Sequence, residues 1–163
     1  MTNILQQCGD LYIEKLREIS QQAFDLRSAQ GIFTNLDESD EVAIRKLVDG
    51  LIELLPELGK LIADKDNLPT DLALTAMIFT YLIMPFDIIP DDGNGLIGFL
   101  DDALVAFLLT DQLEEPDGGL RLIMNKHRHE VAELMTKLPE WFTRAIERYS
   151  VQARAQHQIM KSH

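Results

Sequence analysis

The sequence contains a single cysteine, Cys8, among 163 residues. One cysteine cannot form an internal disulfide, and this scarcity is typical of proteins from a reducing compartment. The first ten residues also lack a basic stretch followed by an apolar run, so no secretory signal is predicted. We therefore expect a cytoplasmic protein.

Basic residues are missing from the middle of the chain. No Lys or Arg occurs between Lys65 and Arg121, and residues 71–117 carry 10 acidic side chains. Residues 118–163 carry 8 basic and 4 acidic side chains, and the whole chain has a net charge of -12. Because the acidic segment would repel a phosphate backbone, nucleic-acid binding is not expected.

The charge contrast predicts that the basic C-terminal region packs against the acidic middle of its own chain or of a second copy. A homo-oligomer is therefore left open. The cations expected to make these pairs are arginines, because a guanidinium can form two parallel hydrogen bonds to a carboxylate. They are Arg121, Arg128, Arg144 and Arg148.

Long hydrophobic runs are also lacking. The longest uncharged run of interest, Leu72 to Phe86, has 15 residues. A bilayer-spanning helix needs roughly 20. The run is apolar nearly all round, which is typical of a central helix in a soluble bundle, so no transmembrane segment is predicted.

Apolar residues recur every three or four positions along the chain, which is the helical period, and no segment alternates as a strand would. The fold class predicted is all-α, a single-domain bundle of about five to six helices around a central apolar helical hairpin. The domain is expected to cover residues 1–151, with the hairpin core at about 70–113. Residues 152–163 are predicted to be a polar, frayed tail.

Helix boundaries follow from turn and cap residues. Gly31 is expected to end the first helix, and Asp37 or Ser39 to cap the second, which Pro56 breaks or kinks. Thr70 is the predicted cap of the third. Further helices are predicted at about 100–113, at 120–138 and from Pro139, the last of them burying Trp141, Ala145 and Tyr149.

Aspartates gather around the turn between the two hairpin helices. They are Asp87, Asp91, Asp92, Asp101 and Asp102. The spacing is Pro85-x-Asp87-x-Ile89-Pro90-Asp91, followed by Leu100-Asp101-Asp102. In this pattern the chain resembles the YkvA-like family, bacterial helical domains of unassigned biochemical function. The resemblance covers about residues 70–109 and implies the helical hairpin, but no activity.

Carboxylates beside apolar surface must be hydrogen-bonded, paired or bound to metal. A structural role is favoured: Asp101 and Asp102 stand where a helix begins, and Asp87 and Asp91 flank prolines in turns. The alternative is a Mg²⁺ or Ca²⁺ site formed by Asp87, Asp91, Asp101 and Asp102, because these ions prefer oxygen ligands. EF-hand spacing is absent.

Other motifs carry less weight. Gly93-x-Gly95-x-x-Gly98 matches a dinucleotide fingerprint, but no strand–helix–strand unit surrounds it and the aspartates would repel a pyrophosphate. His127 lies on an apolar helical stripe and is expected to be a hydrogen-bonded core residue, with a metal-ligand or proton-carrier role as the alternative. His129 and Glu133 form an ordinary surface pair.

No catalytic or cofactor-binding residue is predicted. The function expected is a non-enzymatic helical interaction module with a protein partner. One alternative is a divalent-metal-dependent hydrolase that uses the aspartates with His127 as acid or base. The other is an acidic inhibitor or immunity-type protein that binds a basic partner.

Overall fold

The computed structural model describes residues 4–64, 68–84, 87–91 and 93–161. Within its helices, the side chains of residues 4–6, 8, 28, 157, 160 and 161 are not described. Pro85 and Asp92 of the aspartate motif therefore lie outside the described residues, and so does the side chain of Cys8.

The described residues form helices and no strands, so the predicted all-α class is confirmed. Their order is α1 (Ile4–Ser20), α2 (Leu26–Ile32), α3 (Glu38–Ala63), α4 (Pro69–Ile83), the 3₁₀ helix η1 (Gly95–Phe99), α5 (Leu100–Thr110), α6 (Gly118–Lys137) and α7 (Glu140–Lys161).

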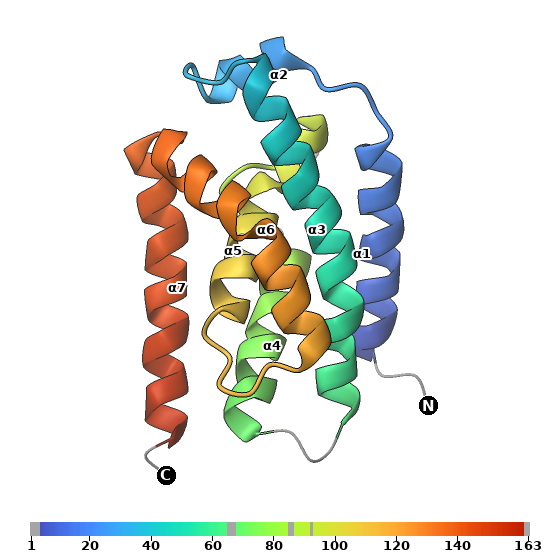
Figure 1. The fold of residues 1–163 in the computed structure, drawn as a ribbon, viewed down its shortest axis with the longest axis vertical. Helices are drawn as coiled ribbons and strands as arrows, with labels where there is room; N and C mark the ends of the chain where they lie inside the picture. The colour runs from blue at the N-terminus through green and yellow to red at the C-terminus, as the bar shows by residue number, and fades with distance from the viewer. Residues whose placement is uncertain (1–3, 65–67, 85–86, 92, 162–163) are drawn as a thin grey trace.

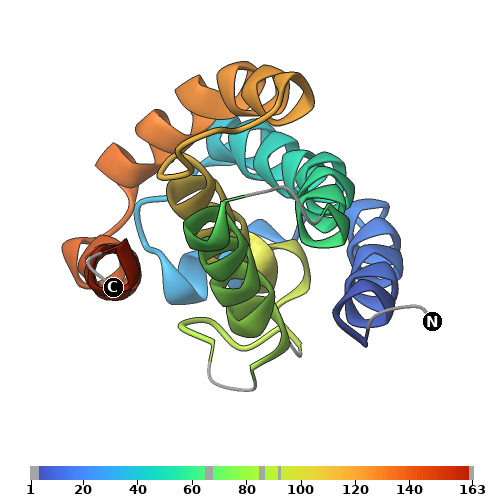
Figure 2. The same ribbon diagram turned by 90° about the horizontal axis from the view of Figure 1, so that it is seen from below.

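The helices form one bundle with α5 at its centre (Figures 1 and 2). The two neighbours α3 and α6 cover one side of α5, α1 flanks α3, and α7 packs on α4 and α5 at the opposite edge. Every residue of α5 except Leu108 is buried. The first turn of α5, which carries two aspartates, is consequently held inside the protein.

Helix α4 is the other half of the predicted hairpin and packs along α5. Leu74 and Ile78 are fully buried, whereas Thr80 and Ile83 are exposed, so α4 presents one face to solvent. No described helix is long and apolar enough to cross a membrane.

Capping was predicted correctly for α3 and incorrectly for α4. Asp37 is the N-cap of α3: its carboxylate accepts a hydrogen bond from the Ser39 amide, and Asp40 bonds back to the Asp37 amide. The N-cap of α4 is Leu68, without a side-chain bond, because Pro69 already supplies a first residue with helical φ. The Thr70 hydroxyl instead bonds Glu114.

Three helix boundaries differ from the prediction. The first predicted helix is two helices, and Gly31 lies within α2 rather than ending α1. Pro56 does not break helix α3, which continues to Ala63 with Leu58 and Leu61 still buried on the same apolar stripe; a kink at Pro56 stays a prediction. Helix α7 extends to Lys161, so residues 152–161 of the predicted polar tail are helical, and Ala153 among them is fully buried.

The buried face of α7 was also predicted incorrectly. Trp141 is 54% exposed and stacks on Phe33 from outside, whereas Phe142 and Ile146 are fully buried. The core face is therefore rotated by one residue, about 100°, from the predicted stripe. Tyr149 is half-buried, as is Ala145.

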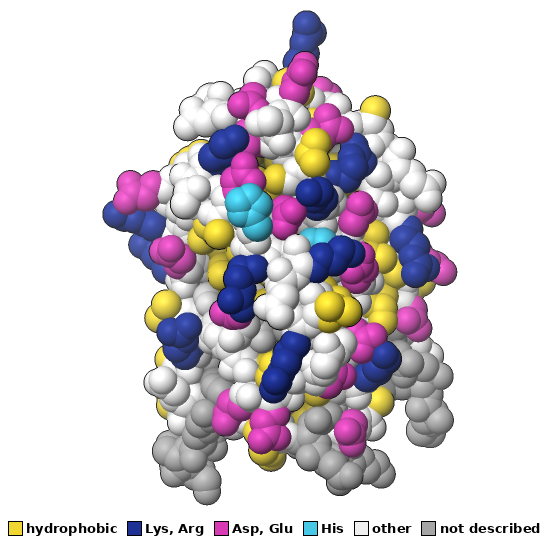
Figure 3. All heavy atoms as spheres, viewed as in Figure 1, with side chains coloured by type: hydrophobic (Ala, Val, Ile, Leu, Met, Phe, Trp, Pro, Cys, Tyr) yellow, Lys and Arg dark blue, Asp and Glu magenta, His cyan; other side chains and the backbone are white. Residues whose placement is uncertain are grey.

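The predicted packing of the basic C-terminal region against the acidic middle of the chain is seen at Arg128, which lies 4.0 Å from Asp111. The Arg121 guanidinium donates to the Pro116 carbonyl in the same acidic segment, whereas Arg144 pairs with Glu140 on its own helix. On the face drawn in Figure 3, basic and acidic side chains are interspersed. The lack of a nucleic-acid partner stays a prediction.

Asp71 anchors the loop between α5 and α6. Its carboxylate is almost fully buried and accepts the backbone amides of Glu114 at 3.0 Å and Glu115 at 3.1 Å. Asp71→Ala should lower the free energy of unfolding by about 1–3 kcal/mol, because two backbone amides lose a charged acceptor. Urea unfolding would measure this. Asp71→Asn keeps one acceptor and should lose less; an equal loss for both variants would argue against the hydrogen bonds as the cause.

Candidate metal centre

Asp101 and Asp102 are fully buried in the first turn of α5. Because η1 leads directly into α5, the helix begins inside the bundle rather than at its surface. Adjacent residues on a helix point about 100° apart. Asp101 accordingly faces α4 and the turn before η1, and Asp102 faces α1.

One oxygen of Asp101 is well satisfied. Its Oδ2 accepts the Tyr81 hydroxyl at 2.8 Å and the backbone amides of Ile88 and Ile89 at 2.9 and 3.4 Å. Its Oδ1 is buried and has no hydrogen-bond partner among the described residues. The carboxylate therefore fastens the turn to α4 and presents its second oxygen inward.

Asp102 repeats this arrangement towards α1. The Tyr12 hydroxyl donates a short hydrogen bond to its Oδ2, and its Oδ1 is buried without a hydrogen-bond partner in the described part of the chain. Tyr12 also meets Phe99 edge-on, with ring centroids 6.0 Å apart. A residue 90 positions away in sequence thus orients this carboxylate.

Asp87 supplies a third inward oxygen. Its side chain is half-buried, and its Oδ1 is buried with no hydrogen-bond partner among the residues described. Asp91 lies nearby and accepts the Lys15 ammonium at 2.9 Å, and the same ammonium is 5.1 Å from the Phe99 ring centroid. Lys15 therefore adds one positive charge at the edge of the group.

Asp87, Asp101 and Asp102 each bring one carboxylate oxygen close to the others. These three oxygens lie within 4.8 Å of one another. An ion at equal distance from three oxygens that far apart would be about 2.8 Å from each, and calcium binds oxygen at about 2.3–2.6 Å, so a calcium site requires a slight contraction. Magnesium, at about 2.0–2.1 Å, requires a larger one. Asp91 does not belong to the three.

Burial makes the ionised form of these carboxylates unfavourable. Loss of solvent raises the pKa of Asp101 to about 6, against four hydrogen bonds that lower it, from the Tyr81 hydroxyl and from the amides of Ile88, Ile89 and Asp101 itself. The pKa of Asp102 is raised well above its ordinary value by burial and by the charge of Asp101, and that of Asp87 is raised by burial and by Asp91. A divalent cation would remove this penalty by neutralising the charges.

The two tyrosines serve as hydrogen-bond donors. Burial, followed by the neighbouring aspartates, raises the pKa of Tyr12 and of Tyr81. Both hydroxyls therefore keep their protons at neutral pH and donate to Asp102 and Asp101.

The predicted capping role of Asp101 and Asp102 is not what their side chains do. The N-cap position of α5 is Phe99, and α5 has no side-chain cap hydrogen bond. The backbone amides bonded by Asp101 belong to the turn at Ile88 and Ile89 instead. Both aspartates still lie in the first turn, where a negative charge is favoured by the helix dipole.

His127 lies apart from the aspartates. It is 4% exposed and packs between Phe107 and Gly50, where a Cβ at position 50 would come within 2.9 Å of its ring. Its Nε2 is 3.9 Å from Glu53, which is beyond hydrogen-bond distance, and neither ring nitrogen has a hydrogen-bond partner among the described residues. The expected hydrogen bond of a core histidine is thus wrong. Burial lowers its pKa, so it is neutral at pH 7. His129 is exposed, 3.8 Å from Glu133.

Residues 71–108 match a family model described as "Protein of unknown function (DUF1232)". No curated protein and no solved structure matches the chain. The DUF1232 match covers most of α4, the turn and most of α5, and so contains Asp87, Asp101 and Asp102. Tyr12 and Lys15 lie outside it, on α1.

Sequence reasoning identified the aspartates but missed the three side chains that hold them, Tyr12, Lys15 and Tyr81. A signal was available, because a buried tyrosine hydroxyl needs a hydrogen-bond partner. That signal does not name the partner, which comes from packing α1 against the start of α5.

Proposed function

We propose that this protein binds one divalent cation through Asp87, Asp101 and Asp102. The observation that carries the proposal is that these three side chains, each with one buried oxygen that has no hydrogen-bond partner among the described residues, bring carboxylate oxygens within 4.8 Å of one another. Buried polar atoms normally have partners, and three neighbouring carboxylate groups that each keep one oxygen without a partner create a strong demand for positive charge.

The ion would stabilise the junction of three segments. Asp102 is joined to α1 through Tyr12, Asp101 to α4 through Tyr81, and Asp87 belongs to the turn between α4 and η1. A cation shared by the three carboxylates would hold these segments together. Oxygen-only ligands favour Ca²⁺, Mg²⁺ or Mn²⁺ over softer metals.

We further propose that the hairpin is of the YkvA-like kind. The support is the spacing of Asp87, Ile89, Pro90 and Asp91, followed by Leu100-Asp101-Asp102, which includes all three proposed ligands. In this proposal the family pattern is a pattern of metal ligands.

The binding test uses protein treated with EDTA and then dialysed. Isothermal titration with Mn²⁺, Mg²⁺ and Ca²⁺ should give one site for at least one ion. Asp101→Asn and Asp102→Asn should each weaken binding at least tenfold, since a charged ligand is lost. Asp111→Asn, at the exposed end of the same helix, is the matched control and should bind normally. Absence of binding for all three ions, or equal affinity of all variants and the parent for the ion, would contradict the proposal.

The other functions expected from the sequence stay predictions. The hydrolase alternative is weakened because His127, its acid or base, contacts Gly50 and Phe107 rather than the aspartates. An interaction module and an acidic inhibitor are compatible with a bound ion. A cytoplasmic location likewise remains an expectation.

A further inference from the structure

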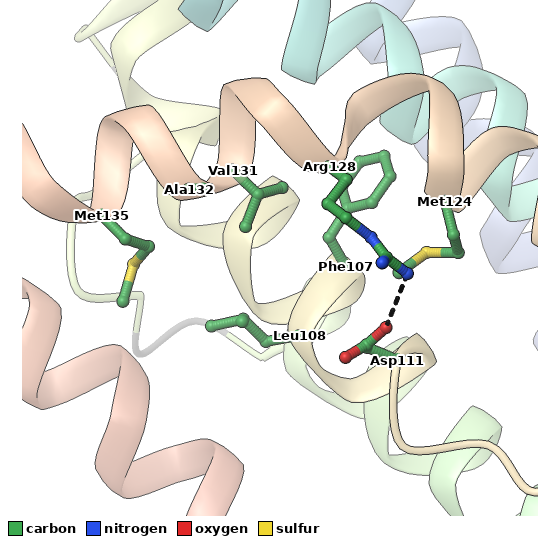
Figure 4. A pocket seen from close by; sticks show the side chains of 8 residues that line it. All are labelled: Phe107, Leu108, Asp111, Met124, Arg128, Val131, Ala132 and Met135. Carbon is green, nitrogen blue, oxygen red and sulfur yellow. Dashed lines mark ion pairs between the residues drawn. The ribbon is translucent and has the colours of Figure 1, made fainter.

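A groove follows α5: its main cavity lies between α5 and α6, and an adjoining hollow lies between α5 and α7. The main cavity has a volume of about 450 Å³, and its apolar walls come from α5 and α6. Figure 4 shows α6 side chains pointing across to α5, with α7 beyond Leu108 and Met135. The apolar lining residues are Phe107, Leu108, Met124, Val131, Ala132 and Met135.

The α6 wall is a second apolar stripe on that helix. Ile123 and Leu134 face the core, whereas Met124, Val131 and Met135 are only half-buried. From Met124 to Met135 the stripe covers 12 residues, and the helix rises about 17 Å between its ends. This is the length of about three turns of a docked helix. Methionine side chains adapt to the shape of such partners.

The charge around the groove has the opposite sign to the rest of the chain. Two smaller hollows adjoin the cavity and share Asp111 with it. The charged residues that line the three are Arg121, Arg128, Arg154, Asp111 and Glu114. They sum to +1, in a chain whose net charge is -12. An acidic partner is therefore matched to this surface, and a second copy of so acidic a chain is not.

The arginines stand on both sides of the groove. Arg121 and Arg128 are seven residues apart on α6, two turns along one edge, and Arg154 lies on α7. The Arg128 side chain is 71% exposed, and its contact to Asp111, at 4.0 Å, is long. A carboxylate on a partner could replace Asp111 at little cost, since exposed pairs of this kind contribute ~0–1 kcal/mol.

We infer that this groove binds an amphipathic helix of a partner protein, with apolar residues at helical spacing and acidic residues along its edges. Helix-in-groove recognition uses anchors at i, i+4 and i+7, which the length and apolar walls of the groove accommodate. The inference is independent of the cation site, because the groove uses the C-terminal end of α5 and the aspartates use its N-terminal end.

The test uses fluorescein-labelled synthetic helical peptides and fluorescence anisotropy. One 15-residue peptide has leucines at i, i+4, i+7 and i+11 and glutamates on both flanks. A second has lysines in place of the glutamates, and a third is a scramble of the first. The glutamate peptide should bind at least tenfold more tightly than the lysine peptide, and the scramble should not bind.

Two groove variants locate the site. Ala132→Gln adds bulk and polarity at an exposed lining position. It should lower the affinity for the glutamate peptide at least tenfold. Arg128→Glu should reduce or reverse the preference for glutamate over lysine. Leu122→Gln, on a different face of α6 and 71% exposed, is the matched control and should bind as the parent does. Circular dichroism and melting temperature confirm that each variant is folded.

Other outcomes overturn the inference. Failure of the glutamate peptide to bind, or equal binding of the glutamate and lysine peptides, contradicts the charge argument. Dimerisation in sedimentation velocity that Ala132→Gln abolishes would assign the groove to a second copy. Binding of laurate that is lost in Ala132→Gln, without peptide binding, would assign it to a small amphiphile. If Asp102→Asn weakens binding of the glutamate peptide and the groove variants do not, the peptide binds at a surface other than this groove.

Discussion

Ile78→Asp is expected to abolish cooperative folding of this protein. Ile78 and Leu74 are fully buried on the inner face of α4, and an aspartate at either position would be an unpaired charge in the core. Such burial costs several kcal/mol, roughly half or more of the ~5–15 kcal/mol that stabilises a typical domain. Leu74→Asp should therefore have the same effect.

Ile83→Asp is the matched control, because Ile83 belongs to the same helix but is 49% exposed. It should change the melting temperature by only a few degrees, as surface substitutions usually do. Thermal melts followed by circular dichroism distinguish the three variants. Cooperative melting of Ile78→Asp at the parent temperature would mean that α4 is not part of the core.

Much of the fold could be predicted from the sequence because helical periodicity is a local property. The hairpin of α4 and α5 and the start of α3 at Asp37 were predicted from spacing and cap chemistry. The break at residues 21–25 was not, since Ile19, Ala23 and Leu26 keep the helical period across it. Period alone does not show where the backbone leaves the helix.

The buried face of α7 was predicted incorrectly for a similar reason. Two stripes, one through Trp141 and one through Phe142, are about equally apolar, and only packing decides between them. Phe33, from the segment after α2, meets Phe142 edge-on at 4.8 Å and leaves Trp141 outside. The sequence of α7 does not contain this information.

The candidate metal site, too, could be predicted from the sequence only in part. The composition and spacing of the aspartates predicted a cluster, but the choice between capping and metal binding depends on which oxygens are satisfied. Tyr12 donates to one oxygen of Asp102, and the Ile88 and Ile89 amides donate to one oxygen of Asp101. The other oxygen of each aspartate has no hydrogen-bond partner among the described residues. These contacts span the chain, so no local pattern specifies them.

Asp102→Asn should make the EDTA-treated protein more stable than the parent at pH 7.5, by ~1–3 kcal/mol. Asparagine keeps an acceptor for the Tyr12 hydroxyl and removes one of three crowded buried charges. The size of the expected stabilisation is taken from the neighbouring Asp101, whose pKa is raised from 3.8 to about 6 by burial. That rise corresponds to about 3 kcal/mol between the two protonation states.

The sign of the pH dependence follows from linkage. A carboxyl group with a raised pKa binds its proton more readily in the folded state, so its penalty is largest well above pH 6 and disappears as the pH falls towards 4. His127 acts oppositely: its pKa is lowered, so the unfolded chain takes up a proton first and stability falls below about pH 6.5. Comparing parent and variant at the same pH cancels this contribution.

Urea unfolding of the parent and Asp102→Asn at pH 7.5, 6 and 4.5 measures the difference. In EDTA the advantage of the variant should shrink as the pH falls, because the parent carboxyl groups become protonated. With a saturating divalent cation at pH 7.5 the order should reverse, since ligand at 100 times its dissociation constant adds about 2.7 kcal/mol to the parent. If Asp102 is instead a structural anchor whose charge is needed, Asp102→Asn will be the less stable protein at every pH, with or without the ion.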